Sequence, residues 1–155
     1  MSDDRKAREE VLEYYRKDVD MLRGYVQWLT EKSGGGVSTE YRPEGGRTVN
    51  FPVYDSTLLR FVKDVDKTVF IDKNYPYVFT RNRIKTVQDE LKFIEKTDIM
   101  NMANIGGILS KYIIGGRTKG RLWAEGVENG VYLKAILKAA EIVDFWTRDN
   151  TGKNN

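Results

Sequence analysis

Residues 111–130 read KYIIGGRTKGRLWAEGVENG and bring a glycine pair, basic side chains, a tryptophan and two glutamates into one short stretch. Apolar residues recur at helical spacing before it, over residues 99–112, and after it, over residues 131–146. A small helix is expected to start near Leu122, between these two patterns. The sequence therefore predicts two core helices that meet at a basic, glycine-rich corner.

One long amphipathic pattern fills residues 1–33. It predicts a single helix over residues 3–32 that ends at Ser33 and the glycines behind it. The apolar stripe of this helix consists of Val11, Tyr15, Val19, Leu22, Val26 and Leu29. Further aromatic residues beside the stripe widen it, so this surface is expected either to pack across the domain or to form a homodimer.

A second pattern predicts a small β-hairpin. Residues 37–54 alternate apolar and polar side chains on both sides of a Pro-Glu-Gly-Gly turn. Residues 55–146 are read as a helical core, in which residues 74–80 are expected to be a turn followed by a short extended piece. These elements predict an α+β, mostly helical single domain over residues 1–146, with a long N-terminal helix, the hairpin and four to five further helices. The polar residues 147–155 are expected to be a disordered tail.

Local signals mark the helices of this core. Asp55 or Ser56 is the expected cap of the helix after the hairpin, and Thr97 or Asp98 caps a later one. Residues 106–107 are two glycines inside a helical pattern, and each weakens a helix by about 1 kcal/mol relative to alanine. Close packing against a neighbouring element is one reason for a helix to keep them.

The composition excludes several kinds of chemistry. The 155 residues include no cysteine and no histidine, which excludes disulfides, thiolate and imidazole metal sites, and histidine-dependent nucleophilic catalysis. The net charge of +3 is too small to indicate nucleic-acid binding by itself, so local clusters of charge matter more. No apolar run approaches the roughly 20 residues that span a bilayer, and the charged N-terminus has no signal-peptide pattern. We expect a cytoplasmic protein with no cofactor and no metal site.

Two stretches resemble an uncharacterised bacterial and phage domain family of unknown function. Residues 51–75, FPVYDSTLLRFVKDVDKTVFIDKNY, are similar to a strand containing Pro and Tyr, an apolar helix and a short aromatic segment of that family. Residues 105–137, IGGILSKYIIGGRTKGRLWAEGVENGVYLKAIL, are similar to its C-terminal pattern, whose positions are here Arg117, Gly120, Trp123, Gly130 and Leu137. The resemblance covers residues 48–140 and implies a bacterial or mobile-element origin without an established activity. Family members often carry Cys and His where this chain has Thr118 and Lys119, so no thiol or imidazole chemistry is implied.

The first candidate site is the basic segment 115–121, GGRTKGR. Glycines let backbone N–H groups approach an anion, an Arg fork matches phosphate oxygens, and Lys adds a point charge. The segment lacks the GxxxxGK[ST] pattern of a Walker loop. The alternative is a helix connector whose glycines form a left-handed cap and whose cations are solvated. The predicted phosphate ligands are Arg117, Thr118, Lys119 and Arg121.

The second candidate site is residues 81–85, RNRIK, which follow several aromatic side chains. Cations interleaved with aromatic rings suit a nucleotide base or a single strand. Arg81 and Arg83 are the predicted phosphate ligands, and Tyr77 or Trp123 is the predicted stacking platform for a base. The alternative is a solvated helix start with its aromatics in the core, and Trp123 as a core anchor. If the two basic segments lie side by side, they form one positive pocket.

Glu125 and Glu128 are the third candidate. Their spacing places both carboxylates on one helix face, where they could serve a glycosidase-like hydrolase or hold a metal. The alternative is structural, because acids in a first helical turn stabilise the helix dipole and can pair with Arg117 or Arg121.

The sequence favours a non-enzymatic binding module of phage or mobile-element origin, with an anti-defence role and a phosphate-bearing nucleotide or signalling molecule as its ligand. One alternative is a protein that inhibits a host defence nuclease, as an anti-CRISPR protein does. The other is a carboxylate-dependent hydrolase. The missing nucleophile–base pairs argue for binding over catalysis.

Overall fold

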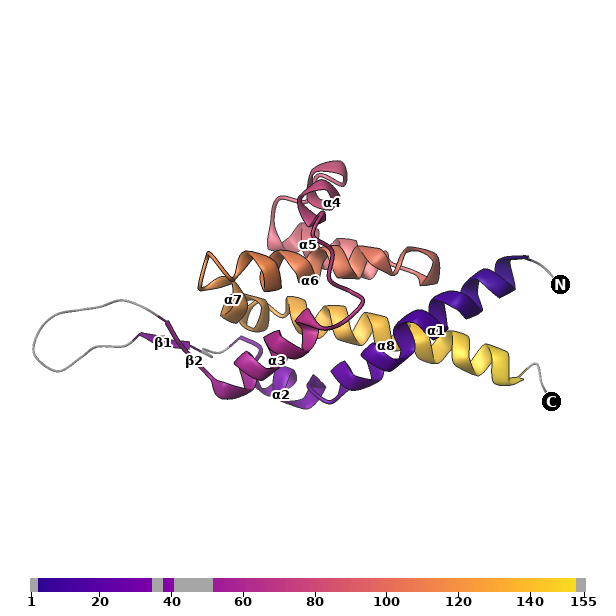
Figure 1. The fold of residues 1–155 in the computed structure, drawn as a ribbon, viewed down its shortest axis with the longest axis horizontal. Helices are drawn as coiled ribbons and strands as arrows, with labels where there is room; N and C mark the ends of the chain where they lie inside the picture. Colours follow the sequence, from indigo (N-terminus) through magenta and orange to yellow (C-terminus); the bar gives the residue numbers. More distant parts are fainter. Residues whose placement is uncertain (1–2, 35–37, 41–51, 153–155) are drawn as a thin grey trace, which may run out of the picture.

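The computed structural model describes residues 3–34, 38–40 and 52–152, which form eight α-helices and one 3-10 helix, η1. Figure 1 shows α6 and α8 through the middle of the molecule, with α4 packed on α6 and α1 crossing α8. The helices are α1 (Asp3–Arg23), α2 (Val26–Lys32), α3 (Ser56–Asp66), α4 (Tyr75–Arg81), α5 (Val87–Glu95), η1 (Ile99–Asn101), α6 (Ala103–Gly115), α7 (Leu122–Glu128) and α8 (Val131–Gly152).

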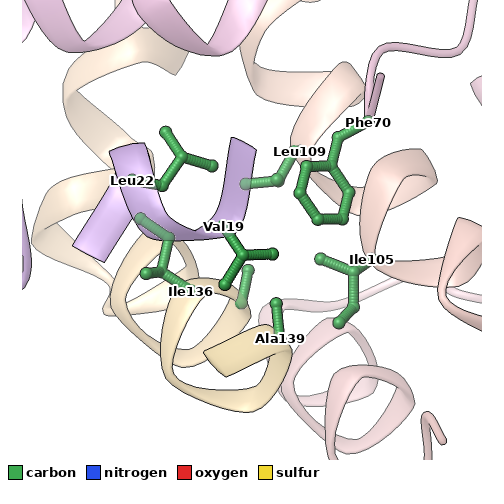
Figure 2. A pocket seen from close by; sticks show the side chains of 8 residues that line it. Val19, Leu22, Phe70, Ile105, Leu109, Ile136 and Ala139 are labelled. Carbon is green, nitrogen blue, oxygen red and sulfur yellow. The ribbon is translucent and has the colours of Figure 1, made fainter. Parts of the chain in front are cut away.

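The core lies where α1, α6 and α8 meet. Figure 2 shows apolar side chains of these three helices and Phe70 pointing toward one another. The gap between them has no room for a water molecule. It is therefore an interstice of a close-packed interior and not a ligand cavity. The residues around it are Val19, Leu22, Phe70, Ile105, Leu109, Ala135, Ile136 and Ala139.

The predicted α+β class is wrong, because the fold is all-helical. Two three-residue strands, β1 (Ser38–Glu40) and β2 (Pro52–Tyr54), pair antiparallel, and Figure 1 shows them projecting from one end of the helical body. A ribbon this short forms no layer against the helices and adds little stability. Residues 41–51, where the hairpin turn is expected, lie outside the described residues.

The predicted single helix over residues 3–32 is interrupted at Gly24 and Tyr25, whose N–H groups donate to carbonyls three residues back. The interruption places Tyr25 in the core, where its ring lies edge-on to Phe61 at 5.0 Å between centroids. The Tyr25 hydroxyl also donates to Asp64 at 2.5 Å. These contacts with α3 outweigh the continuous helical pattern of the sequence.

The predicted N-terminal stripe is buried within the molecule. Tyr15, Val19, Leu22 and Leu29 belong to the core, which favours packing across the domain over a surface reserved for a second copy. Tyr14 beside the stripe remains 60% exposed. A homodimer through this helix stays a prediction.

A turn followed by an extended piece was expected over residues 74–80, but α4 makes residues 75–81 helical, and only Asn74 lies in a turn. Pro76 lies in the first turn of α4, where a missing N–H costs nothing. Val78 then packs against Gly107 of α6: a Cβ atom on that glycine would lie 2.9 Å from Val78 Cγ1. Packing on α6 stabilises a helix that its short, aromatic-rich sequence does not indicate.

The last helix is longer than the sequence indicates. α8 continues through residues 147–152, which were expected to be a disordered tail, and the side chain of Arg16 on α1 donates to Thr147 Oγ1 at 3.3 Å. Contacts with α1 extend the helix past its last strongly apolar residues. Residues 153–155 lie outside the described part of the chain.

The predicted helix caps are confirmed in more specific form. The Asp55 carboxylate accepts from the Thr57 N–H at 2.7 Å at the start of α3. Asp98 accepts from the Met100 N–H at 2.9 Å and caps η1, which leads into α6. Of the alternatives in the sequence, Asp55 and Asp98 are therefore the caps, because a short carboxylate reaches the free N–H groups of the first turn.

Candidate functional site

The connector between α6 and α7, residues 116–121, folds back on the end of α6. The backbone N–H groups of residues 116–119 donate to carbonyl oxygens of Tyr112, Ile114 and Gly115 over 2.9–3.2 Å. These four N–H groups are therefore already used, and an anion at the connector would meet side chains instead.

Gly116 of the connector serves close packing. Gly116 has a φ of −65°, so it is not the left-handed cap of the alternative interpretation. A Cβ atom there would lie closer to the Trp123 ring than the 3.0 Å that Cβ atoms respect. The Trp123 indole N–H donates to the Ile113 carbonyl at 3.0 Å, and the ring packs against the core. This arrangement favours Trp123 as a core anchor over a stacking platform.

Two predicted phosphate ligands already have partners in the molecule. Arg117 Nη2 lies 2.5 Å from Asp66 Oδ1 at the end of α3, although the two side chains remain 54% and 40% exposed. The Thr118 hydroxyl donates to the Gly115 carbonyl at 3.3 Å. Arg117 therefore ties the connector to α3, and Thr118 helps to close the end of α6.

Lys119 and Arg121 are the cations of the connector that face solvent without an acidic partner among the described residues. Together with Gly120, Leu122 and Glu125 they line an open depression of about 380 Å³. The two positive side chains thus share one surface hollow with Glu125, whose backbone N–H donates to the Arg121 carbonyl one helical turn earlier.

The second basic segment lies elsewhere. Arg81 lines a depression of about 300 Å³ with Tyr77 and Asn104, beside the start of α6, whereas the connector follows the end of that helix. A helix of 13 residues is about 20 Å long. Arg81 and the connector cations therefore line separate depressions and not one positive pocket. Arg83 follows α4 at a φ of 55°, with its side chain exposed.

The two candidate carboxylates lie together. Glu125 and Glu128 line an open depression of about 340 Å³ with Val87 and Asn129. In the part of the chain that the structure describes, no group of three or more acidic side chains is placed to hold a metal ion. The hydrolase alternative keeps its paired carboxylates and stays a prediction.

A buried polar cluster was not recognised from the sequence. Glu90 on α5 is 2% exposed and accepts hydrogen bonds from the Tyr112 hydroxyl and from Lys111 Nζ, the latter at 2.5 Å. Asn129 donates to the Tyr112 oxygen at 3.0 Å. A signal was present, because Glu90 lies within the apolar stripe of its helix. Its partners, 21 and 22 residues along the chain, give no local pattern.

The phenols of Tyr15, Tyr25 and Tyr112 are expected to ionise at higher pH than an ordinary tyrosine. Burial raises the pKa of each, and the Glu90 carboxylate raises that of Tyr112 further. The folded protein keeps these protons while the unfolded chain loses them near pH 10, so stability falls as pH rises above about 10. Phenolate absorbance during a pH titration tests this, and Tyr112→Phe should remove the latest-ionising group. Complete ionisation of all tyrosines near pH 10 in the folded state would contradict it.

Comparison of the chain with known proteins gives no match. No family model, no curated protein and no solved structure matches it. The resemblance to a domain family of unknown function therefore stays a prediction. No helix of the described residues is long and apolar enough to cross a membrane.

Proposed function

We propose that the protein is a non-enzymatic binding module whose ligand carries phosphate, such as a nucleotide or a nucleotide-like signalling molecule. The observation that carries the proposal is the pair Lys119 and Arg121, which line one open depression together with Glu125 and form no ion pair with a described residue. Unpaired cations in a hollow attract an anion through charge-assisted hydrogen bonds.

Arg117 can strengthen this site. Its ion pair with Asp66 is largely solvent-exposed, and pairs of that kind contribute about 0–1 kcal/mol. A phosphate group, with more charge and more acceptor oxygens than a carboxylate, competes well for a guanidinium held so weakly.

The origin and role of the module are proposed on the resemblance alone. A bacterial or phage domain that sequesters a phosphate-bearing signal would act against host defence without needing a catalytic nucleophile. Inhibition of a host nuclease through protein contacts is the other form such a role can take, and it requires a protein partner instead of a small ligand.

Calorimetric titration with pyrophosphate and with ATP tests the proposal. The double variant Lys119→Gln/Arg121→Gln is expected to weaken binding by about tenfold or more, since each charge-assisted hydrogen bond contributes about 1.5–3 kcal/mol. Affinity for both ligands should also fall as salt is raised, because the contacts are exposed.

The matched control is Lys6→Gln/Lys17→Gln, which removes the same charge from exposed positions of α1. It should leave the affinity within about twofold. Absence of binding by the parent protein, or an equal loss in both double variants, would reject the connector as the anion site.

A further inference from the structure

We propose that the surface where α4 meets the start of α6 is a second binding site, and that its ligand is single-stranded nucleic acid. The site is the depression lined by Tyr77, Arg81, Asn82 and Asn104, together with the two cations Arg83 and Lys85 that follow it. It combines an exposed aromatic ring, unpaired cations and side-chain amides. The depression lies beside the start of α6, a helix about 20 Å long whose other end leads into the connector, and it shares no lining residue with the anion site there.

The packing of α4 exposes the aromatic ring. Val78 lies against Gly107, where the absent side chain lets α4 approach α6 closely. Tyr77, the residue before Val78, is 64% exposed, and no residue of α4 is fully buried. A large aromatic side chain held at the surface by a packed neighbour offers a flat face on which a base can stack.

The cations beside Tyr77 are available to phosphates. Arg81, Arg83 and Lys85 are all exposed, and none forms an ion pair with a described residue. The nearest acid in the chain, Asp89, is already used: its carboxylate accepts from the backbone N–H of Lys85 at 3.0 Å and caps α5. Three cations within five positions, none of them in an ion pair with a described residue, can follow a sugar–phosphate backbone.

The backbone turn after α4 supports the same conclusion. Arg83 has a φ of 55°, a conformation that costs a non-glycine residue about 1–2 kcal/mol. Glycine or asparagine would fill such a helix C-terminal position more cheaply. Arg83 therefore places an exposed cation at a position whose positive φ favours glycine or asparagine.

The amides of the depression can contact base edges. Asn82 donates its Nδ2 to the Val78 carbonyl at 2.9 Å, which leaves its side-chain oxygen as an acceptor. Asn104 is half-buried, and its amide makes no hydrogen bond to the residues that the structure describes. Base edges are accessible in this way in a single strand, whereas in a duplex they are paired and the bases are stacked on each other.

Fluorescence anisotropy with labelled strands of about 10 nucleotides tests this site. Oligo(dT) and oligo(U) should both bind, and the difference between them reports whether DNA or RNA is preferred. An abasic strand of equal length and charge should bind about 5- to 100-fold more weakly, because it loses the base on Tyr77. Duplex DNA of the same length should also bind more weakly than the single strand.

Variants separate stacking from charge. Tyr77→Ala should weaken the base-containing strand to the level of the abasic strand and leave the abasic strand unchanged, while Tyr77→Phe should keep most of the affinity. Arg81→Gln/Arg83→Gln should weaken both strands. Tyr77, Arg81 and Arg83 are exposed, so these variants are expected to fold.

The Lys119→Gln/Arg121→Gln variant distinguishes this site from the connector. It should leave binding of the oligonucleotide unchanged while it weakens pyrophosphate, and Tyr77→Ala should do the opposite. The proposal is overturned if the parent protein binds no single strand, if abasic and normal strands bind equally, or if only the connector variant reduces strand binding. If the parent protein binds single strands as expected but does not bind pyrophosphate, the connector proposal is rejected and the proposal for the α4 site still holds.

Discussion

Glu90→Ala is expected to lower the free energy of unfolding by about 2–3 kcal/mol, because it removes the buried partner of an ion pair and leaves the buried Tyr112 hydroxyl without its acceptor. Glu90 is 2% exposed and accepts from both Lys111 Nζ and the Tyr112 hydroxyl. Without the carboxylate, the ammonium of Lys111, whose side chain is 32% exposed, loses its counter-charge, and the Tyr112 phenol loses its acceptor inside the packed core. Urea unfolding followed by circular dichroism measures the change.

Two further variants identify the cause. Glu90→Gln keeps an acceptor for Tyr112 but removes the charge that faces Lys111, so its loss should be smaller than that of Glu90→Ala. Glu95→Ala, near the end of the same helix, removes a carboxylate that is 59% exposed and pairs with Lys134. That change should cost much less than Glu90→Ala, because solvent screens an exposed ion pair. Equal losses for Glu90→Ala and Glu95→Ala would show that burial of the first pair carries no special weight.

Much of the helical core could be predicted because its signals are local. Asp55 and Asp98 accept hydrogen bonds from free N–H groups two residues later, so their role as helix caps depends on the local sequence and not on how the helices pack. The apolar residues of the α1 stripe recur every three to four positions in the sequence, and they pack in the core of the structure. The glycine pair of residues 106–107 indicated close packing, and the structure shows Phe70 and Val78 against it.

The elements that sequence reasoning missed are decided by distant contacts. Tyr25 is drawn into the core by Phe61 and Asp64, which lie more than 30 residues away, and the helix breaks before it. α4 depends on its packing against α6. The alternating residues around 37–54 indicated a hairpin, but a ribbon of three-residue strands cannot change a core built from helices.

The same reason limits the candidate site. The sequence grouped Arg117 with Lys119 and Arg121, but the pairing of Arg117 with Asp66 joins residues 51 positions apart. The separation of Tyr77 from the connector follows from the direction in which α4 lies along α6. Residue types and short spacings indicated which side chains could bind a phosphate. Which of them are unpaired, and which share a hollow, depends on packing.

Gly106→Ala is expected to lower the free energy of unfolding by about 1–3 kcal/mol, although alanine in a helix interior normally gains about 1 kcal/mol over glycine. The added Cβ atom would lie closer than 3.0 Å to the Phe70 carbonyl oxygen and 3.1 Å from the carbonyl carbon. These are backbone atoms of the segment between α3 and α4, so they cannot rotate away as a side-chain end can. Phe70 itself is 2% exposed and packs on Tyr15 with ring centroids 4.9 Å apart. Relieving the clash therefore moves a core side chain as well.

Gly115→Ala at the end of the same helix is the matched control for Gly106→Ala. Its nearest neighbour would be Leu122 Cδ1 at 3.0 Å, the far end of a flexible side chain that can shift by a few tenths of an ångström. We expect a change within about 1 kcal/mol for this variant, because the helix gains propensity and loses little packing. Denaturant unfolding of both variants at one pH gives the comparison. If Gly106→Ala proves as stable as the parent, the loop that carries Phe70 can move without cost. The close approach of that loop to α6 would then not be the reason for a glycine at this position.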